Sequence, residues 1–113
     1  MLKKQYRLRR NADFRRIYRQ SKSFSTKYLV LYAHKAKDKR IRVGFSVSKK
    51  IGKANIRNYY KRRLSEIIRR NFDKIEAGYE LVFIARVPIK ELSFYELEQN
   101  VLALLKKSGA MCE

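Results

Sequence analysis

The pattern of apolar and polar positions predicts three strands. Apolar and polar residues alternate over residues 26–34 and again over 41–48, which is the period of a strand with one buried face. The polar segment 35–39 indicates a turn, so we expect these two strands to pair as a hairpin. Residues 79–86 are apolar at successive positions, which predicts a central strand that is buried on both faces.

The same pattern predicts three helices. Apolar residues recur every three or four positions over residues 11–20 and 55–75, as on one face of a helix. A third helix is expected to begin at Ser93, which forms a capping box with Glu96, and to end at Gly109. In the long helix, four residues should lie opposite the apolar stripe: Asn58, Arg62, Ser65 and Arg69.

The order α-β-β-α-β-α predicts an α+β fold, an α/β sandwich in which helices pack on a mixed sheet, for which we expect four strands. A helix connects strand 41–48 to strand 79–86, and a connection of that length indicates a parallel pair. The chain has 113 residues, which suits one domain rather than two. We therefore expect a single domain over residues 1–113, preceded by a basic arm over residues 1–10.

The distribution of charge along the chain indicates what kind of partner the predicted domain binds. The net charge is +19, and residues 1–65 contain 22 Lys and Arg against two acids, whereas residues 66–113 contain 7 against 8. Such an excess destabilises the fold by self-repulsion, and nucleic acid is the commonest polyanion that offsets it. A merely solubilising surface does not need this density of cations.

The sequence predicts a cytoplasmic protein. No apolar run approaches the ~20 residues needed to span a bilayer, and no apolar stretch follows the basic start, so we expect neither a membrane partner nor a secretory signal. The single cysteine, Cys112, can form neither an internal disulfide nor a cysteine-based zinc site.

Aromatic residues are interleaved with the cations. Tyr and Phe stack on unpaired bases, while Arg and Lys neutralise phosphates. On the two alternating strands, the face opposite the aliphatic one carries tyrosines beside small residues, which favours a groove over a packed layer. For Phe14, packing of the first helix on the sheet is an equally good interpretation. The predicted cleft residues are Phe14, Tyr18, Tyr32, Tyr28, Ser46, Ser48 and Arg10.

Catalytic groups are sparse. The only histidine, His34, lies on a predicted strand face among tyrosines. A two-metal nuclease needs clustered carboxylates, but the basic half contains only Asp13 and Asp38, far apart in sequence. No glycine-rich phosphate loop or metal-ligand spacing occurs. We expect no catalytic side chain, no cofactor or metal bound by the protein alone, and no obligate protein partner.

Two adjoining segments carry a recognisable motif: residues 43–54 read VGFSVSKKIGKA and residues 56–62 read IRNYYKR. Together they resemble the bacterial ribonuclease P protein subunit. The family's hallmark is R-N-x-x-K-R-x-x-R on a helix, and its first four fixed positions are matched by Arg57, Asn58, Lys61 and Arg62. Ser65 stands where the family usually has the last arginine, and the sequence leaves open whether Arg63 or Arg69 replaces it. Upstream, further positions fit the family's N-terminal pattern: Leu8, Asn11, Asp13, Phe14 and Tyr18.

The resemblance implies more than the composition does. It implies a left-handed strand–helix–strand crossover, which is an exception to the usual hand. It implies binding to a catalytic RNA that, with Mg²⁺, removes the 5′ leader of precursor tRNA, and it places that leader in the predicted cleft. The residues that would meet the catalytic RNA are Arg57, Asn58, Lys61, Arg62, Lys49, Lys50 and Lys53. The alternatives are a structural RNA-binding protein of the ribosome, without turnover, and a general nucleic-acid chaperone.

Overall fold

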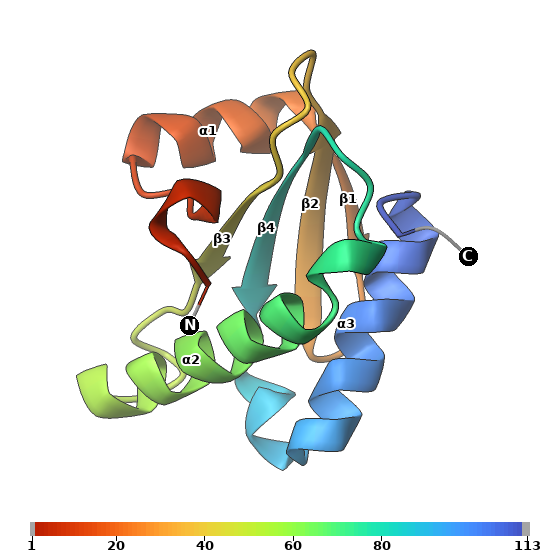
Figure 1. Cartoon of the computed structure of the whole chain (residues 1–113). Coiled ribbons are helices and arrows are strands. Elements are labelled where there is room, and N and C mark those ends of the chain that lie inside the picture. Colours follow the sequence, from red (N-terminus) through yellow and green to blue (C-terminus); the bar gives the residue numbers. More distant parts are fainter. Residues whose placement is uncertain (1, 112–113) are drawn as a thin grey trace.

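A four-stranded mixed sheet forms the centre of the molecule (Figure 1). The computed structural model describes residues 2–111, so Cys112 lies outside the described residues. The strands in chain order are β1 (Lys22–Ser25), β2 (Leu29–Lys35), β3 (Arg42–Ser46) and β4 (Tyr79–Ala85). Their order across the sheet is β1-β2-β4-β3, with β3 parallel to β4 and the other pairs antiparallel. This confirms the predicted mixed sheet and its parallel pair.

Three helices pack on the two faces of this sheet (Figure 1). The main helices are α1 (Asn11–Gln20), α2 (Ala54–Arg70) and α3 (Phe94–Ser108), and the short 3-10 helices are η1 (Lys4–Tyr6), η2 (Phe72–Lys74) and η3 (Val87–Glu91). Leu81 and Phe83 of β4 face the large core that α2 and α3 cover, whereas Val82 faces Ile17 of α1 on the other side. The helices therefore cover opposite faces of the sheet, as the sandwich prediction requires.

The predicted hairpin between residues 26–34 and 41–48 is wrong, because β4 lies between β2 and β3. Leu81, Val82 and Phe83 are all fully buried, and a strand buried on both faces is best shielded in the middle of a sheet with a neighbour on each side. The pattern of apolar and polar positions also did not predict β1, a short and mostly exposed strand that pairs with β2. With β1 added, the predicted order of elements fits the structure.

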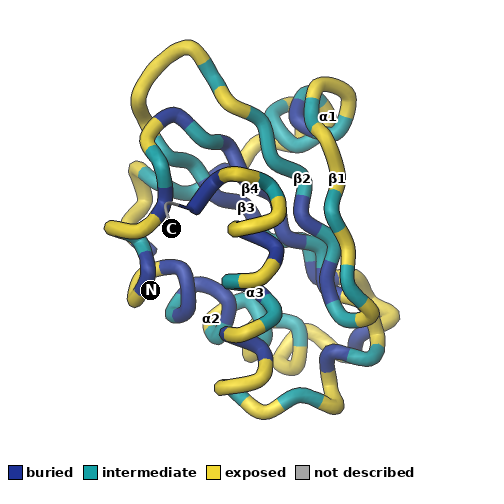
Figure 2. The backbone as a smooth tube through the Cα atoms, turned by 90° about the vertical axis from the view of Figure 1, so that its right-hand side faces the viewer, coloured by how far each residue is buried: buried dark blue, intermediate teal, exposed yellow. Residues whose placement is uncertain are grey.

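Burial is concentrated in the layer between the sheet and helices α2 and α3 (Figure 2). The fully buried apolar residues of α2, Leu64, Ile67 and Ile68, lie in its second half, whereas Tyr60 is only partly buried against this core and Ile56 is 38% exposed. The first half of α2 therefore extends beyond the core and presents its side chains to solvent. Ser65 was expected opposite the apolar stripe, but it is 2% exposed. The buried face of α2 is wider than the stripe of apolar residues and includes this serine.

The ends of the helices follow their capping residues. α3 begins with the predicted capping box, in which Ser93 accepts from the backbone of Glu96 and Glu96 accepts from the backbone of Ser93. Gly109 ends it with a left-handed φ of 83°. α2 ends at Arg70 rather than at residue 75, because Asn71 closes it: its side-chain amide donates to the carbonyl oxygen of Ile67 at 2.8 Å.

Candidate RNA-binding surface

A cleft of about 370 Å³ opens where α1, the end of β3 and the first half of α2 meet. It combines aromatic, polar and cationic side chains from three segments that are far apart in sequence. The lining residues are Asn11, Phe14, Arg15, Tyr18, Phe45, Ser46, Val47 and Lys61. Four of the predicted site residues, namely Phe14, Tyr18, Ser46 and Lys61, are therefore brought together around one cavity.

The aromatic wall of the cleft belongs to α1. The ring centroids of Phe14 and Tyr18 are 6.4 Å apart, and the Tyr18 ring meets that of Tyr32 edge-on at 4.9 Å. Burial raises the pKa of the Tyr18 phenol above its usual value, against an opposing contribution from the Ser46 side chain. Tyr32 packs against Tyr18 and does not itself line the cleft. Phe14 and Tyr18 are therefore the rings of α1 that can meet a ligand, and Tyr32 supports one of them.

Gly44 of β3 lets the α1 wall approach the sheet closely. A Cβ atom at this position would lie 2.5 Å from Cζ of Phe14 and 3.1 Å from Cβ of Leu8. We predict that Gly44→Ala forces the half-buried Phe14 ring outward into the cleft. The expected loss of stability is about 1 kcal/mol, the low end for overpacking, because the ring has room to turn.

Urea unfolding of the Gly44→Ala variant measures this effect. The double variant Gly44→Ala with Phe14→Leu should recover part of the loss, because leucine does not extend as far as the phenyl ring. Unchanged stability of the single variant would show that Gly44 has no steric role.

The first half of α2 supplies the cationic side of the cleft. Lys61 lines it, and Arg57 lies one turn earlier on the same face of the helix. Within residues 2–111 the Arg57 Nε atom is buried and has no hydrogen-bond partner. Asn58 and Arg62 are exposed beside this row, as expected. The four matched motif residues therefore share one accessible side of α2, suited to phosphate oxygens.

The basic link before α2 is also accessible. Lys49, Lys50 and Lys53 are exposed, and Ile51 between them is 1% exposed and anchors the link in the core. Lys53 is the N-cap of α2, so its charge adds to the positive end of the helix dipole. The first turn of α2 contains no acidic residue to offset this field. Anionic groups are therefore favoured at this corner of the molecule.

Three other predicted cleft residues lie elsewhere. Tyr28 is half-buried in the turn between β1 and β2, with the Lys27 Nζ atom 5.7 Å from its ring centroid. Ser48 is exposed beyond the end of β3, and Arg10 is exposed at the N-cap of α1. In the described part of the chain, none of the three lines the cleft.

Sequence reasoning missed several lining residues. Asn11 and Arg15 share the helix face of Tyr18, at spacings of seven and three residues, and this spacing could have revealed them. Phe45 stacks on Phe83 with ring centroids 6.2 Å apart and also borders the cleft. Phe45 can contact both the core and the cleft because β3 is an edge strand of the sheet. The local sequence pattern does not indicate which strand lies at the edge.

The two arginines near Ser65, Arg63 and Arg69, contact other side chains of α2. Ser65 is buried, whereas the Arg63 guanidinium lies 4.5 Å from the ring centroid of Tyr59. Arg69 forms an ion pair with Glu66, one turn earlier on α2. Both arginines therefore have a neighbouring side chain as a partner, and a role for either one in place of the last motif arginine stays a prediction.

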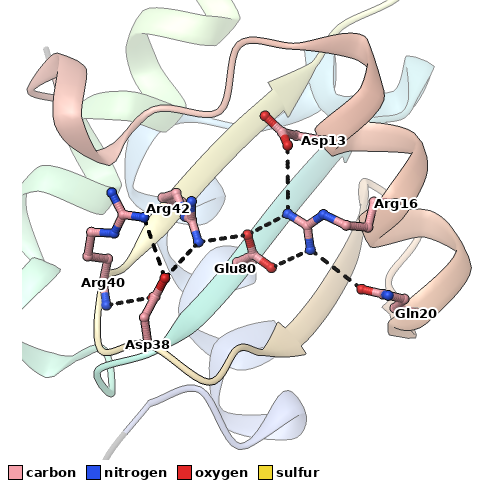
Figure 3. Close-up of polar contacts among 7 residues, drawn as sticks. All are labelled: Asp13, Arg16, Gln20, Asp38, Arg40, Arg42 and Glu80. Carbon is pink, nitrogen blue, oxygen red and sulfur yellow. Dashed lines mark hydrogen bonds and ion pairs between the residues drawn. The ribbon is translucent and has the colours of Figure 1, made fainter.

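An ion-pair network around the buried carboxylate of Glu80 joins α1 to the sheet (Figure 3). Glu80 of β4 is fully buried and accepts two hydrogen bonds from the Arg16 guanidinium, at 2.8 and 2.7 Å. Arg42 of β3 lies 3.3 Å from the same carboxylate, and Asp13 and Asp38 complete the cluster. The hydrogen bond from Arg16 is the main cause that holds the pKa of Glu80 below its usual value. The network sets the position of the helix that forms the aromatic wall.

Similarity to known proteins identifies the family of this chain. The family model for ribonuclease P matches residues 2–109. The chain belongs to the ribonuclease P protein family. It is 46% identical over 102 residues to the ribonuclease P protein component of Clostridioides difficile (strain 630), covering 89% of this chain and 90% of that protein. It is likewise 46% identical over 106 residues to the component of Clostridium kluyveri, covering 92% and 95%.

Solved structures of ribonuclease P proteins share the fold. The protein of Staphylococcus aureus superimposes with a TM-score of 0.88 at 32% identity, covering 95% of this chain and 98% of that one. The protein of Thermotoga maritima gives a TM-score of 0.82 at 35% identity, covering 89% and 96%. The chain is accordingly a subunit of ribonuclease P, an endoribonuclease of tRNA 5′ processing, and associates with ribonuclease P RNA.

Among residues 2–111 of this ribonuclease P subunit, no three His, Cys, Asp or Glu side chains lie close enough together to hold a metal ion. No helix in the same residues is long and apolar enough to cross a membrane.

Proposed function

We propose that the cleft between α1, β3 and α2 binds the single-stranded 5′ leader of precursor tRNA, while the motif side of α2 and the preceding link contact the catalytic RNA. The observation that carries this proposal is the joint presence of Phe14, Tyr18 and Lys61 around one cavity. Exposed rings stack on unpaired bases of any sequence, and a cation beside them neutralises the connecting phosphates. A duplex could not present its bases to these rings, so the cleft favours a single strand.

The two RNA surfaces adjoin each other on α2. Lys61 lines the cleft, whereas Asn58 and Arg62 are exposed on the neighbouring side of the helix. Arg57 and the link lysines extend this surface toward the N-terminus of α2. An RNA held there would lie directly beside a leader in the cleft. The protein would thus bring the leader and the catalytic RNA together and neutralise phosphates that otherwise repel each other.

We assign the chemical step to the RNA and its magnesium ions. The subunit's own residues position and neutralise; no step of phosphodiester hydrolysis is assigned to them. His34 is half-buried and borders a separate hollow with Lys22 and Tyr79. The cleft itself contains no carboxylate and no histidine among its lining residues within 2–111. We further propose a cytoplasmic location, where bacterial precursor tRNAs are made and processed.

The reconstitution experiment tests this function. Precursor tRNA is incubated with bacterial ribonuclease P RNA at a low, near-physiological Mg²⁺ concentration, with and without the protein. We expect cleavage at the mature 5′ end only when both are present. If the folded protein gives no stimulation, while the RNA alone is active at high Mg²⁺, a structural role on ribosomal RNA becomes the better account. Equal affinity for the leader and for random single strands would instead favour a chaperone.

The motif surface gives a second prediction. Arg57→Ala and Lys61→Ala should each weaken binding of ribonuclease P RNA about tenfold, the cost of losing a hydrogen bond to a charged group. Each should also reduce the slope of log affinity against log salt by about one, because one phosphate contact is lost. Filter binding across a salt series measures both quantities.

Lys106→Ala is the matched control for the motif variants. It removes the same charge from an exposed position in the last turn of α3. Its affinity and its salt slope should stay close to those of the parent protein. If Lys106→Ala weakened binding as much as Lys61→Ala, net charge rather than the motif surface would explain the affinity.

A further inference from the structure

A second concave site lies at the other end of β3. This pocket of about 570 Å³ is larger than the cleft and is lined by Gln5, Tyr6, Lys39, Arg40, Ile41 and Phe72. Ile41 precedes β3 and Val47 follows it, so the two sites are separated by about 20 Å along this strand. One nucleotide cannot reach both. No lining residue of the second pocket belongs to the cleft or to the arginine motif.

The back wall of this pocket is aromatic and held in place. The Tyr6 and Phe72 rings contact each other with centroids 4.5 Å apart and an interplanar angle of 44°. Both are half-buried, so each packs on the core and still presents surface. The segment with Tyr6 is tied to the sheet, because the Leu8 backbone N–H donates to the carbonyl oxygen of Val43 at 3.0 Å. The wall is therefore formed before any ligand arrives.

The rim of the pocket is cationic. Lys39 and Arg40 are both exposed in the loop before β3. The one carboxylate in that loop, Asp38, is shared: it lies 3.5 Å from the Arg40 guanidinium and 3.3 Å from that of Arg42 (Figure 3). A single acid between two arginines leaves the loop with excess positive charge. Asp73 follows Phe72 and is exposed, but it is the only other acid next in sequence to a lining residue.

We propose that this pocket binds one unpaired nucleotide of RNA, with its base on the Tyr6–Phe72 wall and its phosphate at Lys39 and Arg40. A purely anionic ligand would leave the aromatic wall unused, and an apolar ligand would leave the cations unused. A nucleotide combines a flat ring and an anion within one residue, which matches both features. The proposal rests on the proposed RNA-binding function and adds a second point of contact to it. The nucleotide can come from the catalytic RNA or from the precursor tRNA.

Direct binding is measured by NMR titration of the whole protein with AMP, with adenosine and with inorganic phosphate. We expect AMP to shift the backbone amide signals of residues 5–7, 39–41 and 72–74. It should do so at a lower concentration than adenosine or inorganic phosphate. Shifts caused equally by phosphate alone would reduce the site to a general anion surface and overturn the proposal. Shifts confined to the cleft on α1 would also overturn it.

Variants test the same pocket with RNA. Lys39→Ala should weaken binding by at least about threefold and lower the salt slope by about one. Lys37→Ala is the matched control, since it removes the same charge from the same exposed loop but outside the pocket. Tyr6→Leu keeps an apolar side chain, and it should weaken binding by about fivefold or more without changing the salt slope. Equal effects of the two lysine variants, with none from Tyr6→Leu, would contradict a nucleotide site.

Separate arms identify the source of the nucleotide. Each variant is measured with ribonuclease P RNA alone, with precursor tRNA, and with tRNA that lacks a leader. A loss confined to the first arm assigns the nucleotide to the catalytic RNA, and a loss confined to the leader-containing substrate assigns it to the leader. If Tyr6→Leu fails to fold by circular dichroism, Lys39→Ala and Arg40→Ala decide the question against Lys37→Ala.

The experiments distinguish a failure of the proposed function from a failure of the proposed nucleotide site. If cleavage is stimulated normally but the pocket variants and AMP have no effect, the pocket inference is wrong and the function stands. If AMP and the variants behave as expected but cleavage is not stimulated, the pocket is a nucleotide site on a protein whose proposed leader function is wrong.

Discussion

Replacing Arg16 by Met should lower the free energy of unfolding by about 3 kcal/mol, the low end for a broken buried ion pair. The reason is that Glu80 is fully buried and receives both of its short hydrogen bonds from Arg16. Methionine keeps the aliphatic length of the arginine but leaves the carboxylate with Arg42 alone, at 3.3 Å. Urea unfolding followed by circular dichroism measures the loss.

The control for this variant is Arg15→Met, the neighbouring position on α1. Arg15 is exposed and borders the cleft rather than the ion-pair network, so its loss should change stability by no more than about 0.5 kcal/mol. The double variant Arg16→Met with Glu80→Gln should be less destabilised than the sum of the two single variants, because no unpaired buried charge is left. Additive effects would show that Arg16 and Glu80 do not interact.

The same pair has a pH signature. The folded-state pKa of Glu80 lies below its ordinary value near 4.5, with the Arg16 hydrogen bond as the main cause. A carboxyl group with a depressed folded pKa contributes stability above its unfolded pKa and loses it as the pH falls through the folded value. The difference between the parent protein and Glu80→Gln should therefore be largest above about pH 4.5. It should shrink progressively below that pH, and a difference independent of pH would contradict the ion pair.

Replacing Tyr18 by Ala should remove most of the preference for substrates that carry a leader. Tyr18 is the ring that lines the cleft between Phe14 and Ser46, and a stacked base is worth about 1–3 kcal/mol. The ratio of affinities for precursor tRNA and for tRNA without a leader should fall by about five- to 150-fold in the reconstituted complex. Competition binding with the two tRNAs gives this ratio directly.

Two further variants separate stacking from structure. Tyr18→Phe keeps the ring and loses only the hydroxyl that faces Ser46, so it should retain most of the preference. Tyr95→Ala removes a 68% exposed tyrosine from α3, away from the cleft, and should change nothing. An equal loss for both tRNAs in Tyr18→Ala would mean that the ring only holds α1 on Tyr32.

For Tyr32, the alternation of apolar and polar residues predicts the face of the sheet but not the role of the side chain. The period-two pattern placed it correctly on the sheet face opposite the main core, and the structure confirms this through its packing with Tyr18 and Val82. Whether it lined a groove or supported another ring depended on where α1 lies, which the strand sequence does not contain. Its role in leader binding stays a prediction, now an indirect one through Tyr18.

Features that arise within one element or one segment can be predicted from the sequence. Helix faces, the capping box at Ser93 and the turn at Gly109 depend on residues within a few positions of each other, so local spacing is sufficient to predict them. The positive first half and the motif over residues 57–62 are equally local. Together they indicate an RNA-binding protein of the ribonuclease P family.

Which distant segments meet depends on how the whole chain packs. The strand order follows from the burial of β4 on both faces, which places β4 between β2 and β3. The sequences of β2 and β3 alone do not predict that β4 separates them. Arg16 and Glu80 are 64 positions apart, and Tyr6, Ile41 and Phe72 are similarly dispersed, so no periodicity relates them. Their contacts arise because the sheet and its covering helices minimise exposed apolar area over the whole chain, and polar partners are then selected by what that packing brings close.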